Sequence, residues 1–242
     1  DDGSNEHAQK ICPASDKLNQ VTRCQEAPSP AEGPAPIAAH LALVVAQGYF
    51  SQMKILHTSD WHLGRRLEGE SLFEPHEHFL RWLTEELIPS QKPDLLVIAG
   101  DIFDRPVPPT EAIELYEKSL AQISKLGVKI LISAGNHDNR VRLGMHSGFL
   151  ENMGVHFRTR LHQIADPVRI EADDFVLLAY GIPYLEPDVD AGANDHQWDV
   201  EPTTHAVMSE ALRLIREDLV TRRKKEVKPV RTLVASHAWV TG

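Results

Sequence analysis

Five short apolar runs lie between residues 54 and 235, and amphipathic stretches separate most of them. The runs are rich in Leu, Ile and Val, as strands buried on both faces are, and they span 54–57, 95–99, 128–132, 175–180 and 230–235. Three stretches repeat apolar residues at the spacing of one helix face, at 75–88, 110–126 and 204–220. This alternation predicts an α/β fold with a largely parallel or mixed sheet covered by helices.

Side chains of the types that bind metals directly follow four of these runs: Asp60, His62, Asp101, Asn136, His137 and His237. In an open α/β sheet, ligands bind outside the carboxyl ends of the strands. We therefore expect these side chains to converge on one edge of the sheet and to form a metal site.

The types of ligand narrow the choice of metal. Carboxylate and amide oxygens together with imidazole nitrogens, and no thiolate, suit Mn²⁺, Fe²⁺ or Zn²⁺, with Mg²⁺ weaker. An Asp can bridge two cations, and two cations about 3.5–4 Å apart can activate water and hold a phosphate.

Composition excludes several classes of protein. The longest apolar run, 41–50, is half of the roughly 20 residues that a membrane-spanning helix needs. The two cysteines, Cys12 and Cys24, leave the rest of the chain without any disulfide framework, which fits a reducing cytoplasm. The net charge of −10 argues against a passive basic binder of nucleic acid.

The pattern of apolar and polar residues in the sequence changes at Met53. Residues 1–52 include the run PSPAEGPAP at 28–36 and show no sustained period, so we expect a flexible N-terminal extension outside the fold. The functional domain is then 53–242. The alternative is an arm docked on the domain through its apolar residues Leu41, Leu43, Val44 and Val45.

The polar motifs occur in a distinctive order: Asp-x-His, Gly-Asp-x-x-Asp, Gly-Asn-His-Asp, and a later strand-end His. In this order they resemble those of the calcineurin-like metallophosphoesterases. Within that family, the chain is most similar to the nuclease subunits of bacterial SbcCD-type complexes. The similar segments are MKILHTSDWHLGR (53–65), GDIFDRP (100–106), GNHD (135–138), GIPYLEPD (181–188) and SHAWVTG (236–242).

The resemblance covers 53–242 and implies a four-layer α/β/β/α sandwich with two divalent ions, Mn²⁺ first, with Mg²⁺, Fe²⁺ or Zn²⁺ possible. It implies exonuclease action on double-stranded DNA and endonuclease action on single strands or hairpins, in DNA repair, replication and recombination. It also implies a homodimer within a heterotetramer, bound to an SbcC-type ATPase subunit. Such a complex has no membrane partner and is cytoplasmic and nucleoid-associated.

The resemblance also implies roles for individual residues. Asp60 and His62 would hold the first ion, Asn136 and His237 the second, and Asp101 would bridge both. His137 would act on the phosphate. The flanking residues expected to orient a His or a turn are Asp104 and Asp138. The arginines that could contact DNA phosphate are Arg65, Arg105 and Arg140.

One part of the family pattern is missing. The family closes its site with a Gly-His-x-His motif on a later strand, and this chain reaches Gly242 without it. The sandwich is therefore expected to lack its C-terminal part, and this chain to bind metal weakly and turn over slowly. Two other functions stay open: a phosphoesterase acting on small molecules or phosphoproteins, and a site-incomplete binding module.

Three further features are interpreted as structural. His76 and His78 are expected on a helix surface, and Trp61 is expected to pack under its loop. The acidic stretch 186–201 is expected to be a solvated loop.

Overall fold

The computed structural model describes residues 21–22, 40–47, 52–192 and 198–239. Cys12, Cys24, the run at 28–36 and most of the expected N-terminal extension lie outside these residues. The largest sheet has the strand order β1-β2-β3-β6-β7-β8. Its strands are β1 (Val21–Thr22), β2 (His40–Gln47), β3 (Gln52–Ser59), β6 (Leu95–Ala99), β7 (Lys129–Ser133) and β8 (Val155–Arg158). From β3 to β8 the strands are parallel.

A second sheet has the order β11-β10-β9, formed by β11 (Val230–Ser236), β10 (Val176–Ile182) and β9 (Val168–Glu171). β10 pairs with β11 in parallel and with β9 antiparallel. All five expected strands are present. The sequence missed β8 and β9, which are four residues each and too short for a periodic pattern to identify.

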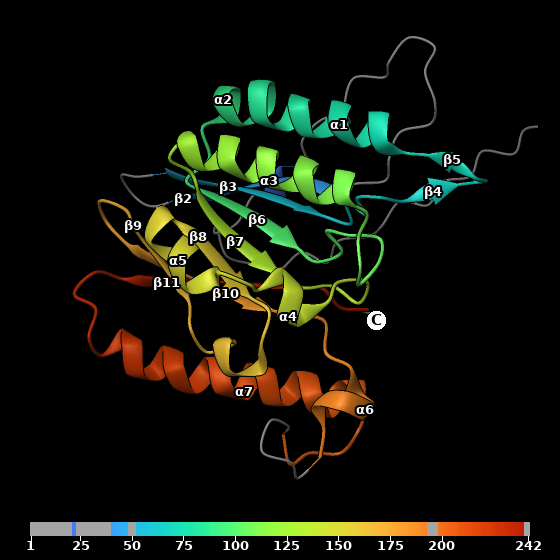
Figure 1. The fold of residues 1–242 in the computed structure, drawn as a ribbon. Coiled ribbons are helices and arrows are strands. Elements are labelled where there is room, and N and C mark those ends of the chain that lie inside the picture. Colours follow the sequence, from blue (N-terminus) through green and yellow to red (C-terminus); the bar gives the residue numbers. More distant parts are fainter. Residues whose placement is uncertain (1–20, 23–39, 48–51, 193–197, 240–242) are drawn as a thin grey trace, which may run out of the picture.

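Helices lie outside both sheets (Figure 1). One outer layer contains α1 (Phe73–Trp82), a π-helical turn η1 (Leu83–Leu87), α2 (Ile88–Gln91) and α3 (Thr110–Lys125), and the other contains α7 (Thr204–Arg223). Short elements complete the chain: β4 (Arg66–Leu67), β5 (Glu70–Ser71), α4 (Arg140–Leu143), α5 (Ser147–Leu150), η2 (Glu151–Met153), η3 (Leu161–Gln163) and α6 (Pro187–Asp190). No helix among the described residues is long and apolar enough to cross a bilayer.

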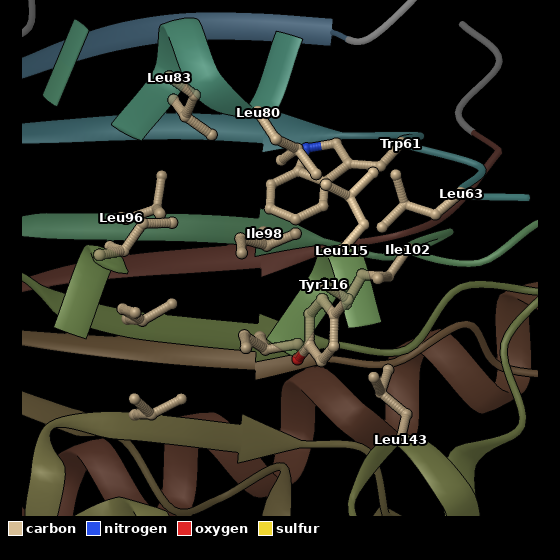
Figure 2. Close-up of a cluster of buried hydrophobic side chains, with 14 of the residues drawn as sticks. Trp61, Leu63, Leu80, Leu83, Leu96, Ile98, Ile102, Leu115, Tyr116 and Leu143 are labelled. Carbon is tan, nitrogen blue, oxygen red and sulfur yellow. The ribbon is translucent and has the colours of Figure 1, made fainter. Parts of the chain in front are cut away.

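Three separate apolar clusters lie between the layers. The first joins α1 and α3 to β3, β6 and β7, and Figure 2 shows Trp61 within it beside Leu80 and Leu115. The second fills the space between the sheets with residues such as Ile55 and Leu177, and the third joins β10 to α7. Because neighbouring residues of β10 point to opposite faces, Leu177 packs on the first sheet and Leu178 on α7. The protein is therefore the expected four-layer α/β/β/α sandwich.

Three aromatic or imidazole side chains test the sequence interpretation of this layer. Trp61 is buried, and its Nε1 atom donates to Thr58 Oγ1 at 2.9 Å, as expected for packing beneath a loop. The surface position predicted for His76 is wrong: this side chain is buried, whereas His78 is exposed. Helix α1 packs on the domain through the face that carries His76, Leu80 and, one turn further on in η1, Leu83, and His78 lies off that face.

Part of the segment before residue 53 is paired with the sheet. β2 runs antiparallel to β3 over eight positions, with Leu43 opposite Leu56 and Val44 opposite Ile55. The docked-arm alternative places an arm in this region. The division of the chain at residue 53 stays a prediction, which deletion of the preceding segment can test.

Candidate metal centre

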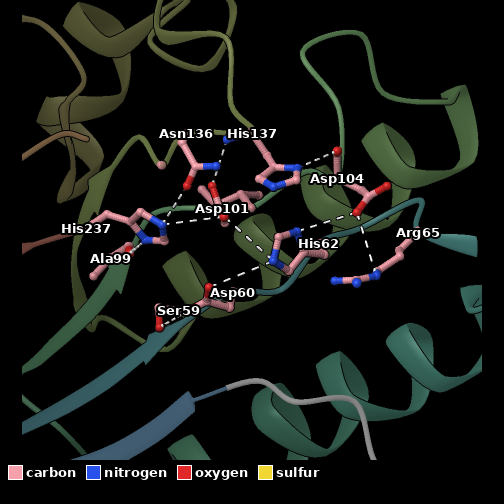
Figure 3. Close-up of polar contacts among 12 residues, drawn as sticks. Ser59, Asp60, His62, Arg65, Ala99, Asp101, Asp104, Asn136, His137 and His237 are labelled. Carbon is pink, nitrogen blue, oxygen red and sulfur yellow. Dashed lines mark hydrogen bonds and ion pairs between the residues drawn. The ribbon is translucent and has the colours of Figure 1, made fainter. Parts of the chain in front are cut away.

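The strand-end side chains meet at the carboxyl edge of the sheets (Figure 3). Their ligand atoms form two groups, each with all atoms within 4.8 Å of one another. One group is His62, Asp101 and His137, and the other is Asp60, Asp101 and His237. These residues come from the ends of β3, β6, β7 and β11. Asp101 belongs to both groups, as a ligand shared by two cations must.

The resemblance implies that Asp60 and His62 share one ion and that Asn136 and His237 share the other. The two groups of ligand atoms in the structure are composed differently. The structure groups His62 with His137 and Asp60 with His237, although Asp60 Oδ1 still lies 3.8 Å from His62 Nε2. Asn136 Oδ1 lies 3.2 Å from His237 Nε2, next to the second group. His137 thus lies close enough to His62 and Asp101 for the three side chains to hold one cation.

Left-handed backbone concentrates at these positions. Among the described residues, six non-glycine residues have positive φ, and three of them are Asp60, His62 and Asp101, at 58°, 46° and 52°. This conformation costs an L-residue roughly 1–3 kcal/mol and persists where the surroundings enforce it. Here Asp60 N donates to Gly100 O at 3.1 Å and His62 N to Asp101 O at 2.9 Å. The strain turns both side chains toward Asp101.

Two glycines make room for the ligands. A Cβ atom on Gly100, which has φ of +85°, would lie 2.6 Å from His237 Cγ. A Cβ atom on Gly135 would lie 2.0 Å from Asp101 Oδ1. Side chains at either position would displace a ligand, so the glycines of GD and GNHD are needed for close approach rather than for a turn alone.

Backbone carbonyl groups fix which nitrogen of two histidines faces the site. His237 Nδ1 lies 2.8 Å from Ala99 O, and His137 Nδ1 lies 2.9 Å from Asp104 O. A carbonyl oxygen only accepts hydrogen bonds, so each Nδ1 atom carries a proton and donates it. The Nε2 atoms are thus left to bind a cation or to hold a proton.

Opposite charges shift the pKa values of this cluster. Burial lowers the pKa of His237, but the Asp101 carboxylate and Ala99 O outweigh burial and raise it to about 9. Burial raises the pKa of Asp101, yet hydrogen bonds from His237 and from His137 N lower it overall. Burial lowers the pKa of His62. The Asp101 carboxylate thus favours positive charge on His237, and a divalent ion at this place would supply positive charge as well.

Asp138 joins two of the site loops. Its carboxylate accepts backbone hydrogen bonds from Ile102 at 3.2 Å, Phe103 at 3.0 Å and Gly135 at 2.9 Å. It therefore orients turns and no histidine. Asp104 Oδ1 lies 3.6 Å from His62 Nδ1, so the other flanking carboxylate faces a candidate ligand.

The three candidate arginines differ in environment. Arg65 and Arg105 are exposed, and each lies 3.9 Å from a carboxylate oxygen of Asp104 at the rim of the site. Arg140 is partly buried and forms an ion pair with Asp190. Asp190 is buried, so the prediction that 186–201 is a solvated loop is wrong at this residue. Residues 193–197 of this stretch lie outside the described part. Nothing in the local sequence signals this burial.

The family model for calcineurin-like phosphoesterases matches residues 53–237. The chain belongs to this family. Its members use divalent metals to hydrolyse phosphoesters, and the carboxylate, amide and imidazole donors around Asp101 suit such ions.

A curated relative is the SbcD subunit of the nuclease SbcCD from Staphylococcus epidermidis (strain ATCC 12228 / FDA PCI 1200). It is 39% identical over 129 residues, which are 53% of this chain and 34% of the relative. The match thus spans about a third of the relative's length. One solved structure aligns with 78% of this chain and 70% of its own, at 14% identity and a TM-score of 0.42, a likeness too slight to bear on the fold.

Proposed function

We propose that this chain is the nuclease part of an SbcCD-type complex and hydrolyses DNA phosphodiester bonds. The observation that carries the proposal is Asp101, whose carboxylate is common to both groups of ligand atoms. Two cations around one carboxylate are suited to an in-line displacement at phosphorus. The choice of DNA rests on the similarity to a nuclease subunit over half of the chain.

The proposed ligands are Asp60, His62, Asp101, Asn136 and His237, with Mn²⁺ the preferred ion and Mg²⁺, Fe²⁺ or Zn²⁺ as alternatives. Bound divalent ions lower the pKa of water and neutralise phosphate charge. Hydrolysis adds a water oxygen to phosphorus, breaks the bond to the leaving sugar oxygen, and places a proton on that oxygen. The Nδ1–H group of His137 donates a hydrogen bond to Asp104 O. The Nε2 atom is therefore the one that can hold a proton for the phosphate or the leaving oxygen.

Arg65 and Arg105 are proposed to contact backbone phosphates near the site, because both are exposed and flank Asp104. Arg140 is a poor candidate for this role, since its guanidinium is bonded to Asp190. The chain as a whole is acidic, so its attraction for DNA must come from such local groups and from bound cations.

The proposed partners are an SbcC-type ATPase subunit and a second copy of this chain, acting on DNA in the cytoplasm at the nucleoid. Homodimer formation is supported by four exposed apolar residues within 141–153, with Phe149 79% exposed: Val141, Met145, Phe149 and Met153. Exposed apolar clusters of this kind are common at protein interfaces.

The test is Mn²⁺-dependent release of nucleotides from linear duplex DNA, with cleavage of hairpins and single strands measured in parallel. We expect slow cleavage that EDTA abolishes and that His137→Ala lowers at least ~100-fold while circular dichroism is unchanged. Hydrolysis of bis-p-nitrophenyl phosphate without any DNA cleavage would favour a small-molecule phosphoesterase. Binding of Mn²⁺ and DNA without hydrolysis would instead favour a binding module.

A further inference from the structure

We propose that Arg140 and Asp190 are positioning residues for the metal centre, because their ion pair holds the loop after β10 against His237. Arg140 begins α4, three residues after His137, and Asp190 ends α6. The two side chains form a bidentate ion pair, here called the fork, with Nη1 2.6 Å from Oδ1 and Nη2 2.7 Å from Oδ2. The proposal rests on the proposed metal centre and does not depend on DNA as the substrate.

The same guanidinium fixes Tyr184, which lies in the loop between β10 and α6. Arg140 Nη2 donates to Tyr184 O, and Tyr184 N donates to Ala134 O at 2.7 Å. Ala134 and Arg140 flank the segment that carries Asn136 and His137. The peptide groups on both sides of Tyr184 are therefore anchored to the loop after β7.

The anchored tyrosine lies against a proposed ligand. The Tyr184 and His237 rings are 6.4 Å apart between centroids, with their planes at 70°, an edge-to-face contact. On its other side, His237 Nδ1 bonds to Ala99 O. Tyr184 and Ala99 thus limit the motion of the imidazole, and the Arg140–Asp190 pair supports the first of these limits through the hydrogen bond from Arg140 to Tyr184 O.

The fork is difficult to replace. The Asp190 side chain is only 3% exposed, and besides Arg140 its carboxylate accepts from Glu186 N at 2.7 Å. Removing one partner of a buried pair leaves an uncompensated charge and costs more than the pair contributes. A lysine at position 140 supplies one ammonium group, which cannot bond Asp190 and Tyr184 O in the same planar geometry.

The experiment compares Arg140→Gln and Arg140→Lys with Arg142→Gln. Arg142 is the matched control, because it lies on the same short helix and its Nη1 donates to Pro106 O at 2.7 Å on the surface. Mn²⁺ affinity is measured by calorimetry, and the slope of DNA affinity against salt is measured separately. We expect roughly 10- to 100-fold weaker binding of one Mn²⁺ ion in both Arg140 variants, an unchanged salt slope, and no effect of Arg142→Gln.

Activity gives a second readout: the Arg140 variants should lower kcat and leave KM nearly unchanged. If they keep full Mn²⁺ affinity, or if their salt slope falls by about one, Arg140 is a phosphate contact and the proposal is wrong. Should Arg140→Gln fail to fold, Tyr184→Ala decides, because it removes the ring and leaves the fork. Unchanged Mn²⁺ affinity in Tyr184→Ala would overturn the proposal, and this titration is valid even if the chain cleaves no DNA.

Discussion

The Nε2 atom of His237 lies 3.5 Å from the Oδ2 atom of Asp101, and the Nε2 atom of His62 lies 3.7 Å from the same oxygen. One carboxylate oxygen therefore faces imidazoles from two different sheets, since His62 follows β3 and His237 follows β11. The packing of one sheet on the other sets the distance across the proposed metal centre.

Asp101→Asn should weaken binding of both Mn²⁺ ions, because the substitution removes the charge that the two ligand groups share. We expect each affinity to fall by more than about 100-fold, whereas Asn136→Ala should weaken one ion only. Isothermal calorimetry distinguishes these results. Two ions bound with native affinity by Asp101→Asn would contradict a bridging role.

Gly100→Ala should disturb the site more than it disturbs the fold. Gly100 and Gly127 both have positive φ, but an added Cβ meets His237 at Gly100 and has open space at Gly127. Gly127→Ala is therefore the matched control and should cost about 1–2 kcal/mol from backbone strain alone. Gly100→Ala should cost more, by chemical denaturation, and should alone reduce Mn²⁺ affinity. Equal effects of the two variants on both measurements would exclude the close approach of His237.

The buried His76 should make stability depend on pH. Burial lowers its pKa from 6.5 to about 4 in the folded protein, and both ring nitrogens lack a hydrogen-bond partner among the described residues. The unfolded chain then binds the proton first, so the free energy of unfolding falls as pH drops from about 6.5 toward 4. The contribution of this one group is about 3 kcal/mol at most.

His76→Leu should remove this part of the pH dependence, because leucine does not titrate. Urea denaturation between pH 4 and 7 compares the native chain with His76→Leu and with His78→Leu, the exposed control on the same helix. The free energy of unfolding of His76→Leu minus that of the native protein should decrease as pH rises and level off near pH 7. If the difference in free energy of unfolding does not change with pH, His76 has the same pKa in the folded and unfolded states and the prediction is wrong.

The exposed apolar residues of 141–153 should control self-association. Phe149→Glu combined with Met153→Glu places charge where the proposed dimer would bury apolar surface. We expect the native chain to sediment as a dimer at micromolar concentration and the double variant as a monomer. Val227→Glu is the control, because Val227 is fully exposed in the loop between α7 and β11. A native monomer, or a dimeric double variant, would reject this interface.

The sequence predicts an α/β fold and the convergence of the candidate ligands for one physical reason, whereas the four-layer arrangement is implied only by the family resemblance. Buried parallel strands need continuous apolar runs, and the residues after such runs must emerge at one edge. The positions of Asp60, Asp101 and His237 follow from this rule alone. Their φ angles and the membership of the two ligand groups do not, because these depend on contacts such as Asp60 N with Gly100 O.

Other features could not be predicted because they depend on packing between distant segments. Asp190 lies in an acidic stretch and is buried only because Arg140, 50 residues earlier, supplies its counter-charge. His76 and His78 occupy one helix, and only the position of α1 on the domain decides which is buried.

Deletion of residues 1–51 tests whether the segment before β3 belongs to the domain. β2 covers one edge of β3 at eight positions, and β6 covers the other. Removing β2 would convert β3 into an edge strand with unpaired backbone groups. A loss of about 2 kcal/mol would lower the melting temperature of a domain of this size by roughly 4–8 °C.

Hydrogen exchange separates that result from a general loosening of the fold. If β2 is part of the sheet, the deletion should speed exchange at β3 amides such as those of Ile55 and His57 and leave β6 protected. If residues 1–52 form the flexible extension that their composition suggests, melting temperature and β3 protection should both be unchanged. Since Asp60 and His62 directly follow β3, the first outcome should also weaken Mn²⁺ binding, and the second should leave it unaltered.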